Sequence, residues 1–269
     1  MKKSIKIQCP AKINLDLKVV NKRPDDFHNI ESVMQTVSLY DYLTITVKKS
    51  DKTEIILSGN STEIPYNEKN IVYKAVELFL KTCVKEPQHV DIYIDKSIPV
   101  SAGLAGGSTN GAGTFFGLNK IFGNILSDGK LHELCAQLGS DLNFCLKGGC
   151  MQTHGRGEVL SDSEYKKQTV NLIKPIKLGI SAKEAYTKFS EKIKNSIDID
   201  SRANYVNDLE WALINDYPEL KHIKAKYPTA IMTGSGSTYF SLDASFEQEE
   251  GYWVKNGLET TEFGVAVVE

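Results

Sequence analysis

The most regular alternation of hydrophobic and polar residues lies near the start of the chain, over residues 12–20. The hydrophobic positions are Ile13, Leu15, Leu17 and Val19, and the polar positions between them are Lys12, Asn14, Asp16 and Lys18. A period of two over this length predicts a half-buried strand. Charged residues on such a strand ordinarily face solvent. Lys12 and Asn14 project the same way directly after Pro10-Ala11, so they are candidates for a site only if other segments support them.

The remaining hydrophobic pattern predicts a mixture of strands and helices. Short strands are indicated over residues 43–48, 53–57 and 90–94, and around Met151 and Leu172. Helical spacing of apolar residues predicts helices over 70–83, 107–122, 131–138, 181–193, 205–214 and 219–226, and residues 229–242 are typical of a hairpin. We find no internal repeat and no linker. Because helices dominate after about Lys174, we expect two lobes with a cleft between them.

Composition narrows the classes of function. The chain has 269 residues, 41% of them hydrophobic, which is enough to bury a substantial core. A net charge of -2 provides no basic field for nucleic acid, so a small-molecule ligand is favoured. The five cysteines include no C-x-x-C pair, which indicates reduced thiols rather than disulfides or a zinc site. With no apolar segment of membrane-spanning length and no export signal, we expect a cytoplasmic protein that does not bind a membrane.

A glycine-rich segment over residues 98–113 is the strongest sign of chemistry. It reads I-P-V-S-A-G-L-A-G-G-S-T-N-G-A-G and runs into a predicted helix. Gly103, Gly106 and Gly107 allow backbone N–H groups to turn inward, and Ser108 or Thr109 can cap the helix, whose positive end attracts anions. The segment is neither a Walker A loop, because no Lys follows the glycines, nor a G-x-G-x-x-G fingerprint. It predicts a phosphate-binding loop, with a glycine-rich packing turn as the alternative.

Three further segments carry polar residues in short gaps between apolar ones. They are R-P-D-D-F-H over residues 23–28, L-G-S-D-L-N-F over 138–144 and T-G-S-G-S-T over 233–238. The first is a turn ending in an aromatic residue and a His, the second places Asp141 in a polar gap, and the third is another glycine loop. Each is a weak signal by itself.

Five motifs in this order resemble the GHMP small-molecule kinases, and within them the 4-diphosphocytidyl-2-C-methyl-D-erythritol kinases of the non-mevalonate isoprenoid pathway. They are P-A-K-I-N at 10–14, R-P-D-D-F-H at 23–28, I-P-V-S-A-G-L-A-G-G-S-T at 98–109, L-G-S-D at 138–141 and T-G-S-G-S-T at 233–238. The resemblance spans nearly the whole chain. It implies an α+β fold of two lobes, 1–150 resembling domain 2 of ribosomal protein S5 and 151–269 a C-terminal α+β lobe, with ATP and acceptor meeting in the cleft.

The resemblance also implies roles in phosphoryl transfer. Asp141 matches the family's catalytic base for the acceptor hydroxyl, and Lys12 matches the Lys that accompanies it. An ammonium beside a carboxylate keeps the carboxylate ionised and offsets charge on the transferred group. Taken alone, Asp141 reads as a helix cap and Lys12 as a surface charge. The ATP-phosphate loop then comprises Pro99, Val100, Ser101, Ala102, Gly103, Leu104, Ala105, Gly106, Gly107, Ser108 and Thr109.

Two further assignments for the donor follow from the resemblance. A hydroxyl of Ser108 or Thr109 is placed near Mg²⁺. Asn70 resembles an Asn of the adenine pocket, although one Asn at a helix start is more often only a cap.

The implied acceptor is a cytidine diphosphate-linked polyol. Phe27 and His28 match a Tyr-His pair that stacks on cytosine and hydrogen-bonds its edge, and Phe keeps the ring face needed for stacking. Taken alone, His28 is an ordinary turn residue. Asn14 faces the methylerythritol end with Lys12 and Asp141, and Tyr186 matches a family position whose role stays open. The resemblance therefore implies phosphorylation of the acceptor's 2-hydroxyl by ATP, in a monomer or a homodimer.

The chain departs from the family pattern at four motifs. Asp26 stands where the family has Gly, Asn110 where it has Asp, with Gly111 after it where it has Ala, and Asn143 and Ser237 where it has Pro. Asp26 loses the conformational freedom of Gly, Asn143 loses a fixed φ, and Gly111 weakens a helix by about 1 kcal/mol relative to Ala. Acceptor specificity is the property these changes affect most. Two alternatives stay open: a GHMP kinase for homoserine, mevalonate or a sugar, and a non-catalytic nucleotide-binding relative.

Overall fold

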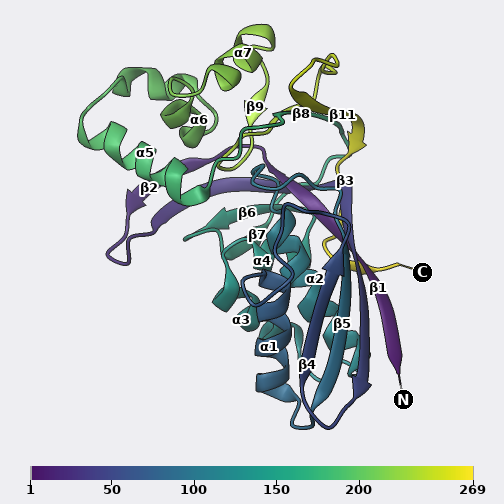
Figure 1. Ribbon diagram of the computed structural model, residues 1–269. Helices are drawn as coiled ribbons and strands as arrows, with labels where there is room; N and C mark the ends of the chain where they lie inside the picture. The colour runs from purple at the N-terminus through teal and green to yellow at the C-terminus, as the bar shows by residue number, and fades with distance from the viewer. Residues whose placement is uncertain (1, 269) are drawn as a thin grey trace.

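A long antiparallel sheet forms the frame of the molecule in a computed structural model that describes residues 2–268 (Figure 1). Its central path runs β12-β1-β3-β5-β4, and the edge pair β4–β5 is parallel. Strands β2 and β6 also pair with β3, and β7 pairs with β6. The bounds are β1 (Lys3–Asn14), β2 (Lys18–Lys22), β3 (His28–Lys49), β4 (Glu54–Gly59), β5 (Gln88–Asp95), β6 (Cys150–His154), β7 (Val159–Asp162) and β12 (Ala266–Val267).

Three of the first four helices pack against this sheet, and the third along the chain packs on the other three (Figure 1). The four helices are α1 (Ile71–Cys83), α2 (Gly106–Ile121), α3 (Asp128–Leu138) and α4 (Leu142–Lys147). Helix α2 lies so close to the sheet that a Cβ on Gly113 would stand 2.5 Å from Cys9 Sγ, and one on Gly117 would stand 2.6 Å from Ile45 Cδ1. These glycines lower helix propensity, but they let α2 pack directly on the sheet and fix where its N-terminus opens.

A second, smaller sheet carries the remaining helices at the other end of the molecule (Figure 1). Its order is β11-β8-β10-β9, all antiparallel. The strands are β8 (Thr169–Pro175), β9 (Ile231–Met232), β10 (Tyr239–Ser241) and β11 (Tyr252–Glu259), and the helices are α5 (Ala182–Lys194), the 3₁₀ helix η1 (Ile199–Asn204), α6 (Asp208–Leu213) and α7 (Pro218–Lys226).

Three hydrophobic cores hold these layers together. One lies between the large sheet and α1 to α4, and a second lies around Trp211 among α5 to α7. The third joins the two sheets, because Ala11 and Ile13 of β1 pack with Leu172 of β8 and Phe240 of β10. Strand β6, which begins at residue 150, and strand β7 pair within the first sheet. The division of the chain into lobes at residue 150 stays a prediction. No helix within residues 2–268 has the length and apolar character needed to cross a membrane.

Most predicted helices are present within a few residues of their expected ends, and the predicted hairpin is the pair β9–β10. The strand predicted over residues 12–20 is wrong in two respects. It breaks after Asn14 and resumes at Lys18, and its polar residues Lys12 and Asn14 are only 3% and 1% exposed rather than solvated. Alternation identified the apolar positions correctly, but it could not show that two glycine loops cover the polar ones: Lys12 donates to the carbonyl oxygen of Gly103, and the N–H of Asn14 donates to Thr233 Oγ1.

Candidate active site

A cavity of about 1260 Å³ lies where the end of β1, the N-terminus of α2 and the start of α5 meet. Seventeen of the eighteen residues predicted from the sequence line it: Lys12, Asn14, Phe27, His28, Asn70, Pro99, Val100, Ser101, Ala102, Gly103, Leu104, Ala105, Gly106, Gly107, Ser108, Asp141 and Tyr186. Thr109 is the exception. The fold therefore brings the candidate donor and acceptor residues to one space.

The glycine-rich loop opens the N-terminus of α2 towards this cavity. Ser101, Gly103 and Ala105 adopt positive φ values of 50°, 74° and 57°, which turn the backbone sharply before the helix begins at Gly106. Ala105 occupies the N-cap position, and no side chain within the described residues caps the helix. The prediction that Ser108 or Thr109 would be the cap is wrong, because both lie inside the first turn. The N–H groups of this turn, at the positive end of the helix, are left for an anion.

The start of the loop is held by Asp41, a fully buried residue of β3. Its carboxylate accepts hydrogen bonds from the backbone N–H groups of Ser97 and Ile98, both at 2.8 Å. It also accepts from Lys96 Nζ at 2.5 Å and from Asn110 Nδ2 at 3.0 Å. Sequence reasoning missed Asp41, although a lone acid within an apolar strand segment is a usable signal. Asn110, one of the departures from the family pattern, therefore donates to a carboxylate that an Asp at this position would repel.

Lys12 lines the cavity beside the glycine-rich loop. Its ammonium donates to Asn14 Oδ1 at 2.6 Å and to the carbonyl oxygen of Gly103 at 2.9 Å. Burial lowers the pKa of Lys12, and the negative charge of Asp141 opposes that shift. No ion pair between Lys12 and Asp141 is found within residues 2–268, so the carboxylate acts on Lys12 through space rather than by contact. Asn14 is fixed in turn, because its backbone N–H donates to Thr233 Oγ1 at 2.9 Å.

Asp141 occupies the N-cap position of α4, but its side chain makes no capping hydrogen bond. A carboxylate serving only as a cap would accept from an N–H group of the first turn. Instead, the Asp141 side chain lines the cavity. It also lies against the turn after β6, because a Cβ on Gly157 would stand 3.8 Å from Asp141 Oδ1. The geometry leaves this carboxylate available to accept a proton.

Aromatic residues and His28 form the other end of the cavity. The rings of His28 and Tyr186 stack with centroids 5.0 Å apart and planes 16° from parallel. His28 Nε2 is 2.9 Å from Ser190 Oγ of α5. Burial lowers the pKa of His28, and the positive charge of Lys22 adds to this effect, so the neutral ring is favoured. The Phe27 side chain is 51% exposed, which leaves much of its ring surface open to a ligand.

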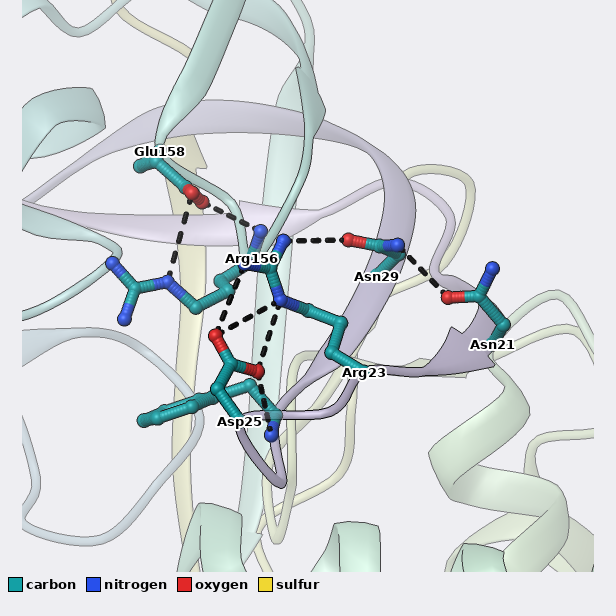
Figure 2. A network of polar contacts seen from close by, with 7 residues as sticks. Asn21, Arg23, Asp25, Asn29, Arg156 and Glu158 are labelled. Carbon is teal, nitrogen blue, oxygen red and sulfur yellow. Dashed lines mark hydrogen bonds and ion pairs between the residues drawn. The ribbon is translucent and has the colours of Figure 1, made fainter.

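A network of polar contacts fixes the turn that carries Phe27 (Figure 2). Arg23 Nε and Nη2 each donate to the Asp25 carboxylate at 3.0 Å, and Arg23 Nη1 donates to Asn29 Oδ1 at 3.0 Å. Asp26, where the family has Gly, has a φ of 65° and pairs with Lys22 at 2.9 Å. The position thus requires the left-handed conformation that Gly adopts most easily and Asp tolerates. Sequence reasoning noted this turn but not its anchoring by Arg23.

Asn70 has the structure of a helix cap. Its Oδ1 accepts from the N–H of Val72 at 2.9 Å at the start of α1, and its Nδ2 donates to the carbonyl oxygen of Pro65 at 2.6 Å. The cap that the sequence offered as the ordinary reading is therefore present. Because Asn70 and Pro65 also line the cavity, the cap fixes this part of the cavity wall.

The second glycine loop, over residues 233–238, closes the cavity beside Lys12. A Cβ on Gly234 would stand 3.0 Å from Lys12 Nζ, and one on Gly103 would stand 2.2 Å from the carbonyl oxygen of Thr233. Asn207 holds this loop, since its Nδ2 donates to the carbonyl oxygens of Met232 at 2.6 Å and Gly234 at 2.9 Å. Sequence reasoning missed Asn207, although its Oδ1 also caps α6 by accepting from the N–H of Leu209 at 2.8 Å, and an Asn near the start of a helical pattern is a usable signal.

Two further departures from the family pattern lie outside the cavity lining. Ser237 donates its hydroxyl to the carbonyl oxygen of Leu178 at 2.6 Å, a bond that Pro could not make. Asn143 Oδ1 lies 3.2 Å from His132 Nδ1. Both side chains act on the frame around the site rather than in it.

Only one of the two hydroxyls predicted near Mg²⁺ faces the cavity. Ser108 lines it. Thr109 is fully buried, and its Oγ1 has no hydrogen-bond partner within the described residues. No group of three or more His, Cys, Asp or Glu residues that could hold a metal is found among residues 2–268. Mg²⁺ takes few protein ligands and completes its shell with phosphates and water, and a Ser hydroxyl just after a glycine-rich phosphate loop, such as that of Ser108, can be one of them.

Comparison of the sequence with those of known proteins gives one family. Residues 70–151 match the family described as GHMP kinases N terminal domain. The 4-diphosphocytidyl-2-C-methyl-D-erythritol kinase of Alkaliphilus oremlandii is 38% identical over 267 residues, which cover 91% of this chain and 90% of that protein.

Solved structures share the fold. A crystal structure of 4-(cytidine 5'-diphospho)-2C-methyl-D-erythritol kinase superposes with a TM-score of 0.70 at 24% identity, over 97% of this chain and all of that one. Homoserine kinase from Cytophaga hutchinsonii superposes with a TM-score of 0.69 at 18% identity, over all of this chain and 98% of the other. Because the two scores are nearly equal, the fold does not distinguish between acceptors.

Proposed function

Because the chain belongs to the family of 4-diphosphocytidyl-2-C-methyl-D-erythritol kinases, we propose that it transfers the γ-phosphoryl group of ATP to the 2-hydroxyl of 4-diphosphocytidyl-2-C-methyl-D-erythritol. The observation that carries this proposal is one cavity holding an uncapped helix N-terminus, the Lys12 and Asp141 pair, and an aromatic end with His28. These are the three parts that a kinase for a base-bearing alcohol requires.

The donor binds along α2. Its phosphates accept hydrogen bonds from the N–H groups of the first turn, which the loop from Pro99 to Ser108 opens to the cavity. Its base lies against the wall that Pro65 and Asn70 form. Gly107 borders the phosphates, since it is exposed and lines the cavity. Mg²⁺ held by Ser108 and the phosphates would neutralise charge on the donor.

The acceptor lies across the cavity from the donor. Its cytosine stacks on Phe27 and hydrogen-bonds His28, and Tyr186 supports the His28 ring from behind. Its methylerythritol end reaches Asn14, Lys12 and Asp141. As the acceptor oxygen bonds to the γ-phosphorus, Asp141 takes the hydroxyl proton and the bond from that phosphorus to the ADP oxygen breaks. Lys12 offsets the negative charge on the moving phosphoryl group.

Free thiols support a cytoplasmic location for this reaction. All five cysteines are unpaired, and four of them are buried. Burial raises the pKa of Cys135 to about 12, which keeps this thiol protonated and unreactive. Such cysteines suit a reducing compartment. The choice between a monomer and a homodimer stays open.

A panel of acceptors tests the proposal against its alternatives. Purified protein is incubated with ATP, Mg²⁺ and one of four alcohols: the cytidyl diphosphate acceptor, mevalonate, homoserine or galactose. We expect ATP consumption only with the first. Turnover of another alcohol would identify a different GHMP kinase, and ATP binding without turnover of any would identify a non-catalytic relative.

A further inference from the structure

Arg156 lies on the short turn between β6 and β7, between the two ends of the acceptor site. Its guanidinium carbon is 5.0 Å from the centre of the Phe27 ring. The next residue is Gly157, where a Cβ would stand 3.8 Å from Asp141 Oδ1. Two consecutive residues therefore reach from the proposed cytosine-stacking ring to the proposed catalytic carboxylate.

The contacts of Arg156 leave its charged end free to bind a ligand. Its backbone N–H donates to Glu158 Oε2 at 2.5 Å, and its Nε is 3.6 Å from Glu158 Oε1. Asp25, the other nearby acid, is already paired with Arg23. Within the part of the chain that the structure describes, neither terminal nitrogen of Arg156 has a hydrogen-bond partner. Figure 2 shows the end of this side chain extending away from the Arg23–Asp25 pair.

The turn itself is held firmly. The Glu158 side chain folds back on the turn, and the Glu158 carbonyl oxygen accepts from Asn143 Nδ2 of α4 at 3.5 Å. The Arg156 side chain is 29% exposed and lines the cavity. The guanidinium is thus half-buried on a turn that is itself fixed. This arrangement favours anion binding because the Arg156 side chain loses little conformational entropy when a ligand binds.

We propose that Arg156 binds the diphosphate of the acceptor. This inference rests on the proposed function. In the acceptor, the diphosphate connects the cytidine to the methylerythritol, so a molecule with its base on Phe27 and its polyol at Asp141 must place the diphosphate between them. A guanidinium presents its terminal N–H groups as a planar fork that matches phosphate oxygens. Arg156 would then distinguish a nucleoside diphosphate conjugate from a bare nucleoside.

A two-ligand binding experiment tests this assignment. The ligands are CDP, followed by calorimetric titration, and cytidine, followed by ligand-observed NMR. In Arg156→Gln we expect the affinity for CDP to fall about 10-fold to 100-fold, the range for a lost charged hydrogen bond, while the affinity for cytidine changes little. Arg156→Lys keeps the charge but loses the fork, and should give an intermediate loss for CDP.

Two control variants separate this role from others. Phe27→Ala removes the stacking ring, so it should lower the affinity for CDP and the affinity for cytidine by a similar factor. Lys147→Gln removes one positive charge outside the cavity, where Lys147 pairs with Asp162 at 2.8 Å, and should leave CDP binding unchanged. The KM for ATP should stay constant in Arg156→Gln.

Each contrary result has a distinct meaning. If Arg156→Gln weakened the binding of CDP and of cytidine by the same factor, Arg156 would only hold the Phe27 ring in place. If Arg156→Gln raised the KM for ATP, Arg156 would bind the donor instead of the acceptor. Either result overturns the diphosphate assignment while the proposed function stands. Failure of the wild-type protein to bind either cytidine or CDP would overturn the cytidyl acceptor itself, and the assignment with it.

Discussion

The carboxylate of Asp141 is the residue on which the proposed chemistry depends. In Asp141→Asn the side chain keeps its size but cannot take the acceptor proton, so kcat should fall by roughly 10² to 10⁴, the scale of general-base catalysis. Because the Asp141 side chain makes no capping bond, the melting temperature and ATP binding should be nearly unchanged. Steady-state kinetics together with calorimetric titration of ATP provide the measurement. Turnover near that of the wild type would remove Asp141 from the mechanism.

His28 should make stability depend on pH. Its pKa is lowered from 6.5 in the folded protein by burial and by Lys22, so folding favours the neutral ring. Above pH 6.5 the ring is neutral in both the folded and the unfolded chain, so His28 does not change the free energy of unfolding. As pH falls from 6.5 towards the folded pKa, the unfolded chain takes up the proton first, and the folded state is destabilised. Between pH 7.5 and 5.5 the wild type should therefore lose more melting temperature than His28→Gln. Equal losses would show that His28 is not responsible.

Sequence reasoning identified site residues better than it identified their surroundings. The motifs located Lys12 and Asp141, but the ordinary readings of both residues failed for reasons of tertiary structure. Lys12 is buried because the loops that carry Gly103 and Gly234 converge on it, and Asp141 stands at a cap position without capping. Asp41 and Asn207 escaped notice because most of their partners lie far along the chain: Asp41 accepts from groups of Lys96, Ser97, Ile98 and Asn110, and Asn207 Nδ2 donates to the carbonyl oxygens of Met232 and Gly234.

Helix α2 offers a direct test of the phosphate loop. A Cβ on Gly107 would meet no atom within 4 Å, so Gly107→Val should fold, with its free energy of unfolding changed by less than about 1 kcal/mol. The new side chain would fill space that the donor phosphates need, so the KM for ATP should rise strongly.

Gly129 supplies the matched control. It is likewise the second residue of a helix, α3, and a Cβ on it would also meet no atom within 4 Å, but it lies outside the cavity. Gly129→Val should leave the KM for ATP unchanged. A loss of stability in Gly107→Val with normal ATP kinetics would favour the packing-turn alternative.

The link between α6 and the second glycine loop should affect turnover as well as stability. Asn207→Ala leaves two buried carbonyl oxygens without their hydrogen-bond donor, which should lower the free energy of unfolding by about 1 to 3 kcal/mol. The same change removes the hydrogen bond that holds Gly234 beside Lys12, so Lys12 can shift. A shift of about 1 Å in a catalytic group lowers the rate roughly 100-fold, and we expect kcat to fall by up to this factor. Thermal unfolding and steady-state kinetics check the two effects.

Ser127→Ala is the comparison for Asn207→Ala. Ser127 caps α3 by accepting from the N–H of Lys130 at 3.4 Å, far from the cavity lining. Loss of this cap should lower the free energy of unfolding by about 1 kcal/mol and leave kcat unchanged. If Asn207→Ala also kept its kcat, Asn207 would be purely structural.

Elements with strong local periodicity could be predicted, and those made by distant pairing could not. Helix α1 carries its apolar residues at helical spacing and its cap at Asn70. By contrast, β3 runs from His28 to Lys49 because β1, β2, β5 and β6 pair along different parts of it. The short helix α4 and strand β12 have too few residues to show a period.

At the scale of the whole molecule, the site exists because two sheets share a core. The cluster around Ala11, Ile13, Leu172 and Phe240 fixes the second sheet against β1, so the loops at 99–108 and 233–238 converge on Lys12. Hydrophobic patterns could predict two lobes and a cleft. The order of five motifs, rather than periodicity, indicated which residues would meet there.

The identity of the phosphorylated product tests the central claim most directly. The protein is incubated with ATP, Mg²⁺ and 4-diphosphocytidyl-2-C-methyl-D-erythritol, and the product is analysed by ³¹P NMR and mass spectrometry. We predict stoichiometric formation of ADP and of an acceptor that carries one new phosphate monoester at its 2-hydroxyl, formed roughly 10² to 10⁴ times more slowly by Asp141→Asn. An unmodified acceptor, or a phosphate at another hydroxyl, would contradict the account.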